Sequence, residues 1–487
     1  MRNVLAQAGI FLAVSGIAYA QGRPLDWSFY GGDAQRTGWE KSDSRITKEN
    51  IKDFQLVLKR KLENGQGGQR SLSPPVVIGN LISYKGFKEL GFVSGSSDTL
   101  WSIDVDVDRI FWQKRLVPSK VSSAIASGTC SAVVTATPSL TPPMNFAARP
   151  RPAAPAPVNA APPKPRGILG TGAFGEPRPA FALSSDGKLH LLNTSNGDDL
   201  VPPISFIPAN GNASSLALSD GVIYTTTDSR CGGATGVWAL DLSNVDPKST
   251  SMPHASSFLL KGGNISSLGG VAFGTDGTLY VQASELLALK PKDLTLRQSF
   301  TVSAAVVTPV VFAHAGHDLI VTAGSDGSLY LLDDHLSLVS RTASLTPSGG
   351  NIWGGLSSWQ DADGTRWVLA PVWGPEKDAS KGSIVAFKLE AREGKPVLTQ
   401  AWVSRDMISP EPPVITSGVV FALSAGAYPS GHATLYALDA LTGKEMYSTG
   451  DQVSAPGNLT GMSIANGRVY FTTSDNTLYA FGIFLER

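Results

Sequence analysis

The chain has 487 residues, of which 42% are hydrophobic and 16% are charged, so it can bury a large core. Lysine and arginine together number 40, as do aspartate and glutamate, and this balance argues against nucleic acid or an anionic membrane as the main partner. The 51 glycines indicate many tight turns.

The first twenty residues have the pattern of a secretory signal peptide. Arg2 supplies the positive charge, residues 4–17 form a short, mostly apolar run, and Ala18-Tyr19-Ala20 fits a small-x-small cleavage site. The apolar run is too short to span a bilayer, and no other segment reaches that length. A buried amino-terminal helix is the alternative interpretation. We expect an exported protein, periplasmic or secreted, with residues 1–20 removed.

A short apolar and aromatic pattern, which ends in aspartate in its full form, recurs about eight times along the chain. The clear copies lie at residues 237–241, 329–333, 435–439 and 478–481, and weaker copies lie at 100–104, 189–193, 286–290 and 384–388. Neighbouring copies are about 43 to 55 residues apart, except across one proline-rich insert. Repeats of this length, each made only of strands, predict an all-β fold, an eight-bladed β-propeller of four-stranded antiparallel blades.

The ends of the repeat array predict how the ring closes. Too few residues follow the last repeat to supply its outer strand, whereas the strand-like segment Phe54–Leu62 precedes blade 1 without a partner. We predict that this amino-terminal strand closes the ring as the outer strand of blade 8, which removes an exposed sheet edge. The propeller then spans residues 54–487, after an extension at 21–53 with a short helix.

The strands of the first two blades are read from turn signals and composition. In blade 1 a turn at Gly79-Asn80 separates the first two strands, which we place at Pro75–Gly79 and Leu81–Tyr84. Residues 138–179 contain 12 prolines, and we predict a disordered insert in blade 2 between strands Cys130–Thr137 and Ala180–Ser184. This insert is either an arm that docks a partner or a tolerated surface insertion, and its composition favours the second.

The two cysteines, Cys130 and Cys231, are candidates for a disulfide in an exported protein. Cys130 begins the inner strand of blade 2, and Cys231 lies in a loop of blade 3 on the same face of the ring. We therefore predict a disulfide that joins neighbouring blades; two separate thiols are the alternative.

Two sets of residues resemble a known family. The segments Trp27–Asp33, Arg36–Trp39 and Ile46–Ile51 resemble the amino-terminal opening of quinoprotein dehydrogenases. The repeats resemble those of the pyrroloquinoline quinone (PQQ) repeat family, within the quinoprotein alcohol dehydrogenase-like superfamily. The repeat residues that follow the family pattern are Ala437, Asp439, Thr442, Gly443 and Tyr447, and in part Ser102, Asp104 and Trp112.

The resemblance implies an eight-bladed propeller but not one activity, because non-enzymatic propellers such as an outer-membrane assembly subunit share these repeats. Several family features are missing. The final tryptophan of the unit, which joins neighbouring blades in the enzymes, is kept clearly only at Trp112. The sequence has no adjacent cysteine pair, no Cys-x-x-Cys-His motif for haem, and no run of acidic residues spaced like a calcium loop.

A quinone cofactor would need an aromatic floor, cations for its carboxylates, a metal held by oxygen ligands and a carboxylate base. We expect such groups in the loops around one mouth of the channel. The candidates are Glu411 as the base and Arg70, Trp353, Trp373, Arg405 and Asn458 as cofactor-binding residues. The same loops hold Asn264, Glu376, Asp378, Asp406 and His432. Core packing of the tryptophans and exposed ion pairs of the charged residues are the simpler interpretations.

His314 and His317 lie three residues apart beside a glycine turn, but the sequence locates no further ligands for a metal ion, and no metal site is predicted. The favoured function is an exported binding or scaffold propeller without quinone catalysis, with a protein or small molecule at the channel mouth. The first alternative is a PQQ- and calcium-dependent dehydrogenase of an alcohol or sugar. The second is an assembly factor whose blade edges bind extended peptides.

Overall fold

The computed structural model describes residues 26–83, 86–117, 137–140, 178–209, 211–229, 233–245, 252–262, 265, 268–302, 306–346 and 349–483. The predicted disulfide between Cys130 and Cys231, the signal peptide at 1–20, Asn264 and most of the insert at 138–179 lie outside these ranges.

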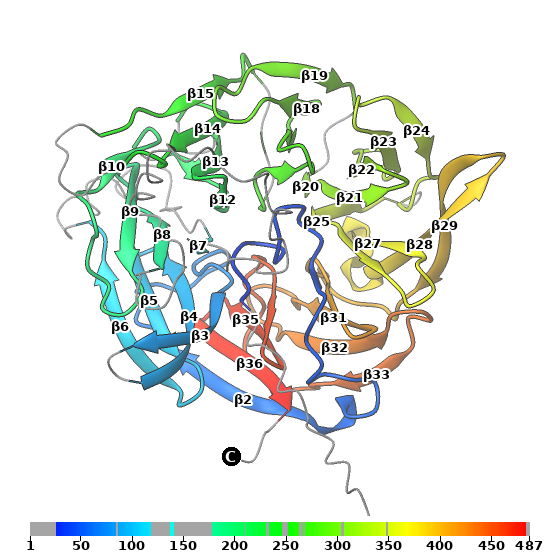
Figure 1. The fold of residues 1–487 in the computed structure, drawn as a ribbon. Helices are drawn as coiled ribbons and strands as arrows, with labels where there is room; N and C mark the ends of the chain where they lie inside the picture. The colour runs from blue at the N-terminus through cyan, green and yellow to red at the C-terminus, as the bar shows by residue number, and fades with distance from the viewer. Residues whose placement is uncertain are drawn as a thin grey trace, which may run out of the picture.

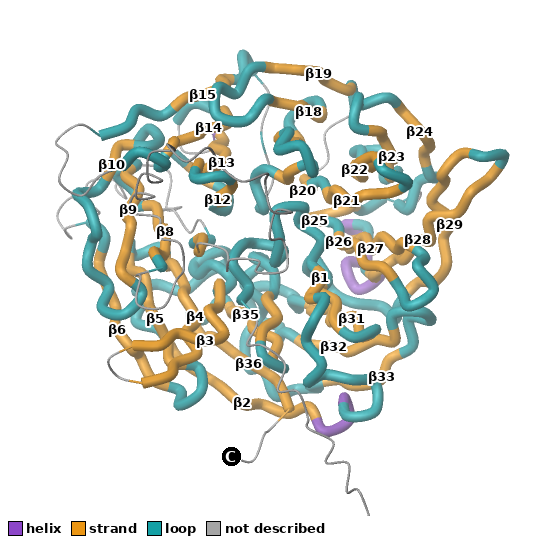
Figure 2. Tube along the Cα trace, viewed as in Figure 1, coloured by secondary structure: helices purple, strands orange, loops and turns teal. Residues whose placement is uncertain are grey.

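Eight antiparallel β-sheets stand side by side around a central axis (Figure 1). This arrangement confirms the predicted all-β, eight-bladed propeller. Helical structure in the described ranges is limited to short turns such as η1 (Ile51–Asp53) and η3 (Glu376–Lys381), drawn in purple in Figure 2. No helix in the described part of the chain is long and apolar enough to cross a bilayer.

The first four blades follow one another in chain order, each from its inner to its outer strand. Blade 1 contains β3 (Val76–Ser83), β4 (Gly86–Gly95), β5 (Thr99–Asp104) and β6 (Arg109–Arg115). Blade 2 contains β7 (Ser139–Leu140), β8 (Pro179–Leu183), β9 (Lys188–Asn193) and β10 (Ile204–Ser205). Blade 3 contains β11 (Asn212–Ala213), β12 (Ala217–Ser219), β13 (Val222–Asp228), β14 (Gly236–Asp241) and β15 (Ser256–Leu259). Blade 4 contains β16 (Ala272–Phe273), β17 (Leu279–Gln282), β18 (Leu286–Leu289) and β19 (Leu296–Phe300).

The other four blades complete the ring. Blade 5 contains β21 (Val310–His314), β22 (His317–Ala323), β23 (Leu329–Asp333) and β24 (Leu338–Arg341). Blade 6 contains β25 (Asn351–Gly355), β26 (Ser357–Gln360), β27 (Arg366–Trp373), β28 (Ser383–Arg392) and β29 (Lys395–Val403), and β20 (Val306–Thr308) runs parallel to β25. Blade 7 contains β30 (Val414–Thr416), β31 (Val419–Ser424), β32 (Thr434–Asp439) and β33 (Glu445–Ser448), and β1 (Trp39–Glu40) runs parallel to β30. Blade 8 contains β34 (Ser463–Ala465), β35 (Arg468–Thr473), β36 (Thr477–Ile483) and β2 (Phe54–Lys61).

The outer strand of blade 8 comes from the amino-terminal part of the chain. Strand β2 pairs antiparallel with β36 from Phe54 opposite Ile483 to Lys61 opposite Thr477, with one bulge near Val57. This pairing confirms the predicted ring closure. It brings β2, from the amino-terminal part of the chain, and β36, the last described strand, into one sheet (Figure 1).

The predicted bounds of blades 1 and 2 were wrong in two places. Strand β3 runs through Gly79-Asn80, where a bulge between Ile78 and Leu81 absorbs the residues that were predicted as a turn. The second strand is therefore β4, after residues 84–85, and not Leu81–Tyr84. In blade 2 the innermost described strand is β7, which lies inside the stretch that composition assigned to the insert.

Hydrophobic clusters fill the gaps between neighbouring blades. Between blades 6 and 7, for example, Trp367 and Ala386 pack with Ile415 and Leu438. The largest cluster joins blades 7, 8 and 1 and includes Leu58 of the closing strand. Each blade therefore buries both faces only when two neighbours are present, as in other closed repeat proteins.

Two tryptophans, and not one, donate hydrogen bonds to the neighbouring blade. Trp112 donates its indole N–H to the carbonyl of Thr194 at 2.9 Å, and Trp402 donates to the carbonyl of Ala440 at 3.1 Å. Trp402 stands opposite Ala386 in its sheet, as Trp112 stands opposite Ser102. The sequence pattern missed Trp402 because the long β28–β29 hairpin separates it from its repeat.

Candidate functional site

The central channel is occupied by the chain's own amino-terminal segment, residues 26–43, which we call the axial segment. It runs through the middle of the ring in Figure 1. Trp27 exchanges backbone hydrogen bonds with Val77 of blade 1. Carbonyls further along the axial segment then accept hydrogen bonds from successive inner strands, the donors being Leu140 in blade 2, Phe273 in blade 4, Val311 in blade 5, Ser358 in blade 6 and Ile415 in blade 7.

The axial segment ends on blade 8, where the carboxylate of Asp43 accepts the N–H of Gly467 at 2.6 Å. Its backbone groups thus find partners in the blades, as buried backbone must. The inner strands of these blades are in turn paired on the side that faces the axis.

Tyr30 is a buried side chain of the axial segment that lies between residues of several blades. A Cβ atom at Gly269 would lie 2.8 Å from the Tyr30 ring and one at Gly461 would lie 3.1 Å from it, so both glycines give the ring its room. The Tyr30 Oη is buried and makes no hydrogen bond. Burial raises the pKa of Tyr30 well above its usual value, and the nearby carboxylate of Glu411 raises it further.

Arg36 anchors the axial segment from below. Its Nε donates to the carbonyl of Val271 at 2.8 Å and its Nη1 donates to the carbonyl of Tyr30 at 2.6 Å. Burial lowers the pKa of Arg36 to about 10, while the nearby carboxylate of Asp33 acts in the opposite direction.

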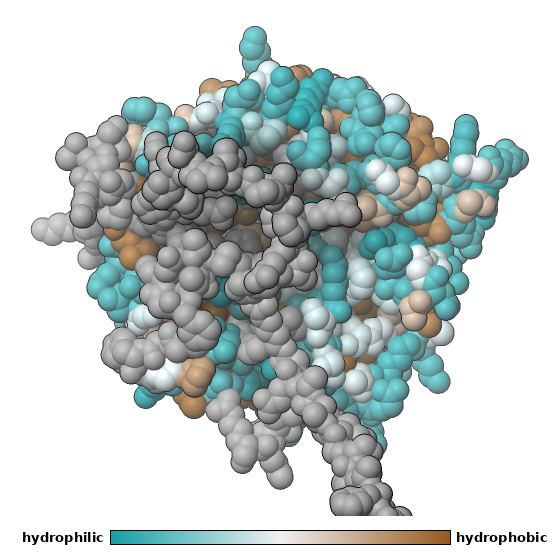
Figure 3. Space-filling view, viewed as in Figure 1, coloured by the Kyte–Doolittle hydropathy of each residue, from teal (hydrophilic) through white to brown (hydrophobic). Residues whose placement is uncertain are grey.

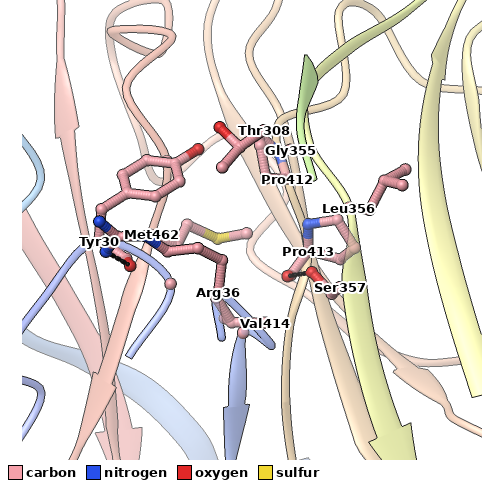
Figure 4. Close-up of a pocket in the computed structure, with 13 residues that line it drawn as sticks. Tyr30, Arg36, Thr308, Gly355, Leu356, Ser357, Pro412, Pro413, Val414 and Met462 are labelled. Atoms are coloured by element: carbon pink, nitrogen blue, oxygen red, sulfur yellow. Dashed lines mark hydrogen bonds between the residues drawn. The ribbon is translucent and has the colours of Figure 1, made fainter. Parts of the chain in front are cut away.

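A cavity of about 20 Å³ lies beside these two side chains, with room for about one water molecule. In Figure 4 the Tyr30 ring reaches toward Thr308 and Gly355, with Arg36 and Met462 beneath it. This cavity is too small for a quinone.

Two tryptophans of blade 6 stack on each other at the mouth. Trp353 on β25 and Trp373 at the end of β27 have ring centroids 4.7 Å apart with 27° between their planes. The guanidinium carbon of Arg70 lies 5.6 Å from the centroid of the Trp353 ring, and only 4% of Trp353 is exposed. Trp373 donates its indole N–H to the carbonyl of Pro410 at 2.9 Å. The aromatic surface of Trp353 is thus used in packing.

Glu411 is a buried carboxylate that connects two loops of this mouth. It precedes blade 7, and its oxygens accept the backbone N–H groups of Leu459 at 3.1 Å and Gly461 at 2.6 Å in the loop before blade 8. Burial raises the pKa of Glu411 to about 7, although those N–H groups and the cation of Arg70 act in the opposite direction.

This pKa gives a testable pH dependence. Because folding raises the pKa of Glu411 from 4.5 to about 7, the folded state holds the proton more tightly, so the free energy of unfolding should fall as pH rises through this window. The fall is at most about 3 kcal/mol for a shift of this size. Urea denaturation from pH 5 to 8 measures it in the wild type and in Glu411→Gln.

The difference between the two proteins isolates Glu411, because Glu40 and Glu89, whose pKa values burial also raises to about 7, are present in both. A difference that stays constant from pH 5 to 8 would contradict the prediction. At pH 5, where the carboxyl of the wild type is protonated, we expect the variant to be less stable by about 1–3 kcal/mol, since one amide oxygen replaces two acceptors, and this difference should shrink as pH rises to 8.

The structure brings five of the predicted residues to this mouth: Arg70, Trp353, Trp373, Glu411 and Asn458. Asn458 has a structural environment, since its amide donates to Leu72 at 2.8 Å and its oxygen accepts the N–H of Ser71 at 3.1 Å.

Arg405 lies elsewhere, because it pairs with Glu445 at 2.6 Å and covers the ring of Tyr436. The other charged loop residues of the prediction are exposed: Glu376, Asp378, Asp406 and His432. Asp406 pairs with Lys381 at 2.9 Å and His432 with Asp451 at 3.2 Å.

Sequence reasoning did not assign Tyr30 or Arg36 to this site. Both lie in the segment that resembles the amino-terminal opening of quinoprotein dehydrogenases, but a sequence resemblance does not say where these side chains lie in the fold. The available signal was Gly31-Gly32 and Gly38 around them, since glycines with positive φ allow the tight turns that the axial segment makes.

The residues that gather at the mouth do not fit PQQ with a calcium ion. Calcium takes six to eight oxygen ligands, whereas both oxygens of Glu411 already accept backbone N–H groups and the amide of Asn458 holds Leu72. In the described ranges, three histidine or acidic side chains close enough to share an ion occur on blade 5, at Asp333, Asp334 and His335, and not at the mouth. The Trp353 ring, which could have formed a cofactor floor, is buried.

Comparison with known proteins finds relatives of the repeats and of the fold. Residues 380–483, from blade 6 to blade 8, match the family described as outer membrane protein assembly factor BamB. No curated protein matches the chain.

Solved structures of the same fold include two quinohemoprotein alcohol dehydrogenases and a methanol dehydrogenase. The enzyme from Comamonas testosteroni is 13% identical with a TM-score of 0.58, over 95% of this chain and 81% of that one. The enzyme from Pseudomonas putida HK5 is 11% identical with a TM-score of 0.60, over 94% and 80%. A europium-containing methanol dehydrogenase is 11% identical with a TM-score of 0.60, over 94% and 98%. At these identities the likeness shows the fold alone, a propeller of PQQ-like repeats.

Proposed function

We propose that this propeller of PQQ-like repeats is an exported binding or scaffold protein that does not carry quinone catalysis. The observation that supports this most is the filled channel. The side chain of Tyr30 occupies the axis under the mouth, between Gly269 and Gly461, where a flat cofactor would need open space. Because the chain itself fills the axis, a partner would bind to the outer surfaces and loops of the ring.

The mouth is the surface where we place a protein or small-molecule partner. Arg70 and Trp373 are partly exposed there, and both are residue types that are enriched at binding surfaces. On the described part of the face shown in Figure 3, most residues are hydrophilic and the hydrophobic ones are scattered near the rim. The signal-like residues 1–20 support the periplasm as the compartment.

A cofactor-binding experiment tests this proposal against the dehydrogenase alternative. The purified protein is incubated with PQQ and calcium, and its melting temperature and its reduction of a dye with alcohols or aldoses are measured. We expect no shift in melting temperature and no dye reduction at saturating cofactor, while a quinoprotein alcohol dehydrogenase run beside it shows both. A shift together with substrate-dependent reduction would overturn the proposal.

A second candidate is a chaperone-like propeller that binds extended segments of outer-membrane proteins, and the match of residues 380–483 supports it. The outer strands of blades 3 to 6 each expose one large aliphatic side chain, at Leu259, Leu296, Leu338 and Val403. Such strands can accept an added strand. Hydrogen exchange of these strands should slow when an unfolded outer-membrane protein is added, and unchanged exchange on all of them would remove this candidate.

A further inference from the structure

Half of the histidines in this protein gather at one end of blade 5. The chain has 6 histidines, and His314, His317 and His335 lie on two turns that are close in space. His314 and His317 face each other across the turn between β21 and β22. His335 lies in the turn between β23 and β24, next to Asp333 and Asp334.

Asp334 connects the two turns. Its Oδ2 is 3.5 Å from Nδ1 of His317, and its Oδ1 is 2.7 Å from Nδ1 of His335. Asp333, Asp334 and His335 can each offer one ligand atom, and these atoms lie within 4.8 Å of one another. Ligands at about 2.1 Å from a tetrahedral ion stand about 3.4 Å apart, so small side-chain rotations would enclose an ion.

His314 extends this set from the opposite strand. Residues directly opposite each other in an antiparallel pair have Cβ atoms about 4.5–5.5 Å apart and point to the same face of the sheet. The hairpin turn at Ala315-Gly316 has positive φ at both residues, which fixes this pairing. His317, which contacts Asp334, is therefore flanked by the imidazole of His314.

The backbone holds the acidic side of the cluster in place. One oxygen of Asp333 accepts the N–H groups of His335 at 3.0 Å and Ser337 at 2.7 Å, which shapes the turn. The hydroxyl of Tyr280 on the neighbouring blade donates to the carbonyl of Asp334 at 3.4 Å. The two histidines remain open to solvent, with 74% of the His317 side chain and 76% of the His335 side chain exposed.

We propose that Asp333, Asp334 and His335, with His317 and His314 beside them, form a binding site for a divalent transition-metal ion. Imidazole nitrogen with carboxylate oxygen is the donor set of zinc, nickel and copper, and not of calcium or magnesium, which prefer oxygen alone. The ion would tie the two turns of blade 5 together and keep water or a partner's ligand at its open side. The site is independent of the channel mouth and of the function proposed above.

Calorimetric titration with zinc sulfate tests the site on the full chain after removal of any purification tag. We expect one ion per chain for the wild type. The double variant His317→Ala, His335→Ala should bind at least about tenfold more weakly. Both side chains are exposed, so the double variant should keep the melting temperature of the metal-free wild type.

His432→Ala is the matched control, because His432 is also an exposed histidine that pairs with an aspartate, Asp451 at 3.2 Å, but it does not belong to the cluster on blade 5. It should leave zinc affinity unchanged. Equal affinity in the wild type and the double variant would overturn the proposal, as would a loss of binding in the control. Cobalt provides a second measurement, because a thiolate charge-transfer band in its absorption spectrum would place the ion on cysteine instead.

Discussion

Replacing Leu58 by aspartate is expected to lower the free energy of unfolding by about 3–5 kcal/mol, enough to prevent folding of a marginally stable ring. Leu58 is 2% exposed and lies on the closing strand, in the cluster that joins blades 7, 8 and 1. A charge at this position would have no partner in an apolar environment. Urea denaturation followed by circular dichroism measures the change.

Leu56→Asp is the matched control on the same strand. Leu56 is 37% exposed, so the same charge there should change stability by about 0.5 kcal/mol or less. If the two variants were equally stable, β2 would not be the outer strand of blade 8 in the register seen here, and the ring would close in another way.

The second large effect is expected at Tyr30. Tyr30→Ala should cost about 3–5 kcal/mol, because it leaves a cavity on the axis between backbone atoms that cannot collapse around a closed ring. Tyr30→Phe should leave stability unchanged or raise it by about 1 kcal/mol, since the Oη that it removes has no hydrogen-bond partner. Thermal and urea unfolding of the three proteins measure both effects.

The comparison of Tyr30→Phe with Tyr30→Ala separates the effect of the hydroxyl group from the effect of the ring's volume. If Tyr30→Phe were as destabilised as Tyr30→Ala, the hydroxyl would have a partner that the structure lacks, and the filled axis would need another explanation. Equal stability of Tyr30→Ala and the wild type would show that the axial segment does not pack in the channel.

The repeat in the sequence predicted most of the fold. Alternating strands with a period near that of one blade identify a propeller, and the unpaired segment Phe54–Leu62 identified the closing strand. Local turn signals were less reliable. Gly79-Asn80 looks like a hairpin turn, but tertiary packing continues the strand through a bulge there. The axial segment has no periodic pattern, and its glycines indicate tight turns but not a path inside the ring.

The candidate site could be predicted only as a set of loops. Blade topology places Arg70, Trp353 and Glu411 at one mouth, and the structure brings them together. The direction of a loop side chain does not follow from topology, which is why Arg405 turns outward to Glu445. The partners of His317 were missed for a similar reason, because Asp334 and His335 are close to it only after two turns of blade 5 fold together.

The path of the amino-terminal residues has a consequence for how the protein reaches its final form. Residues 26–61 leave a ribosome or a translocation pore before any strand that will hold them has been made, and their last partner, β36, is at the opposite end of the chain. The pairing of β2 with β36 can therefore form only after β36 has been made. We therefore expect a chain truncated before β36 to be cleaved by proteases faster than the full chain, because β2 then has no partner strand.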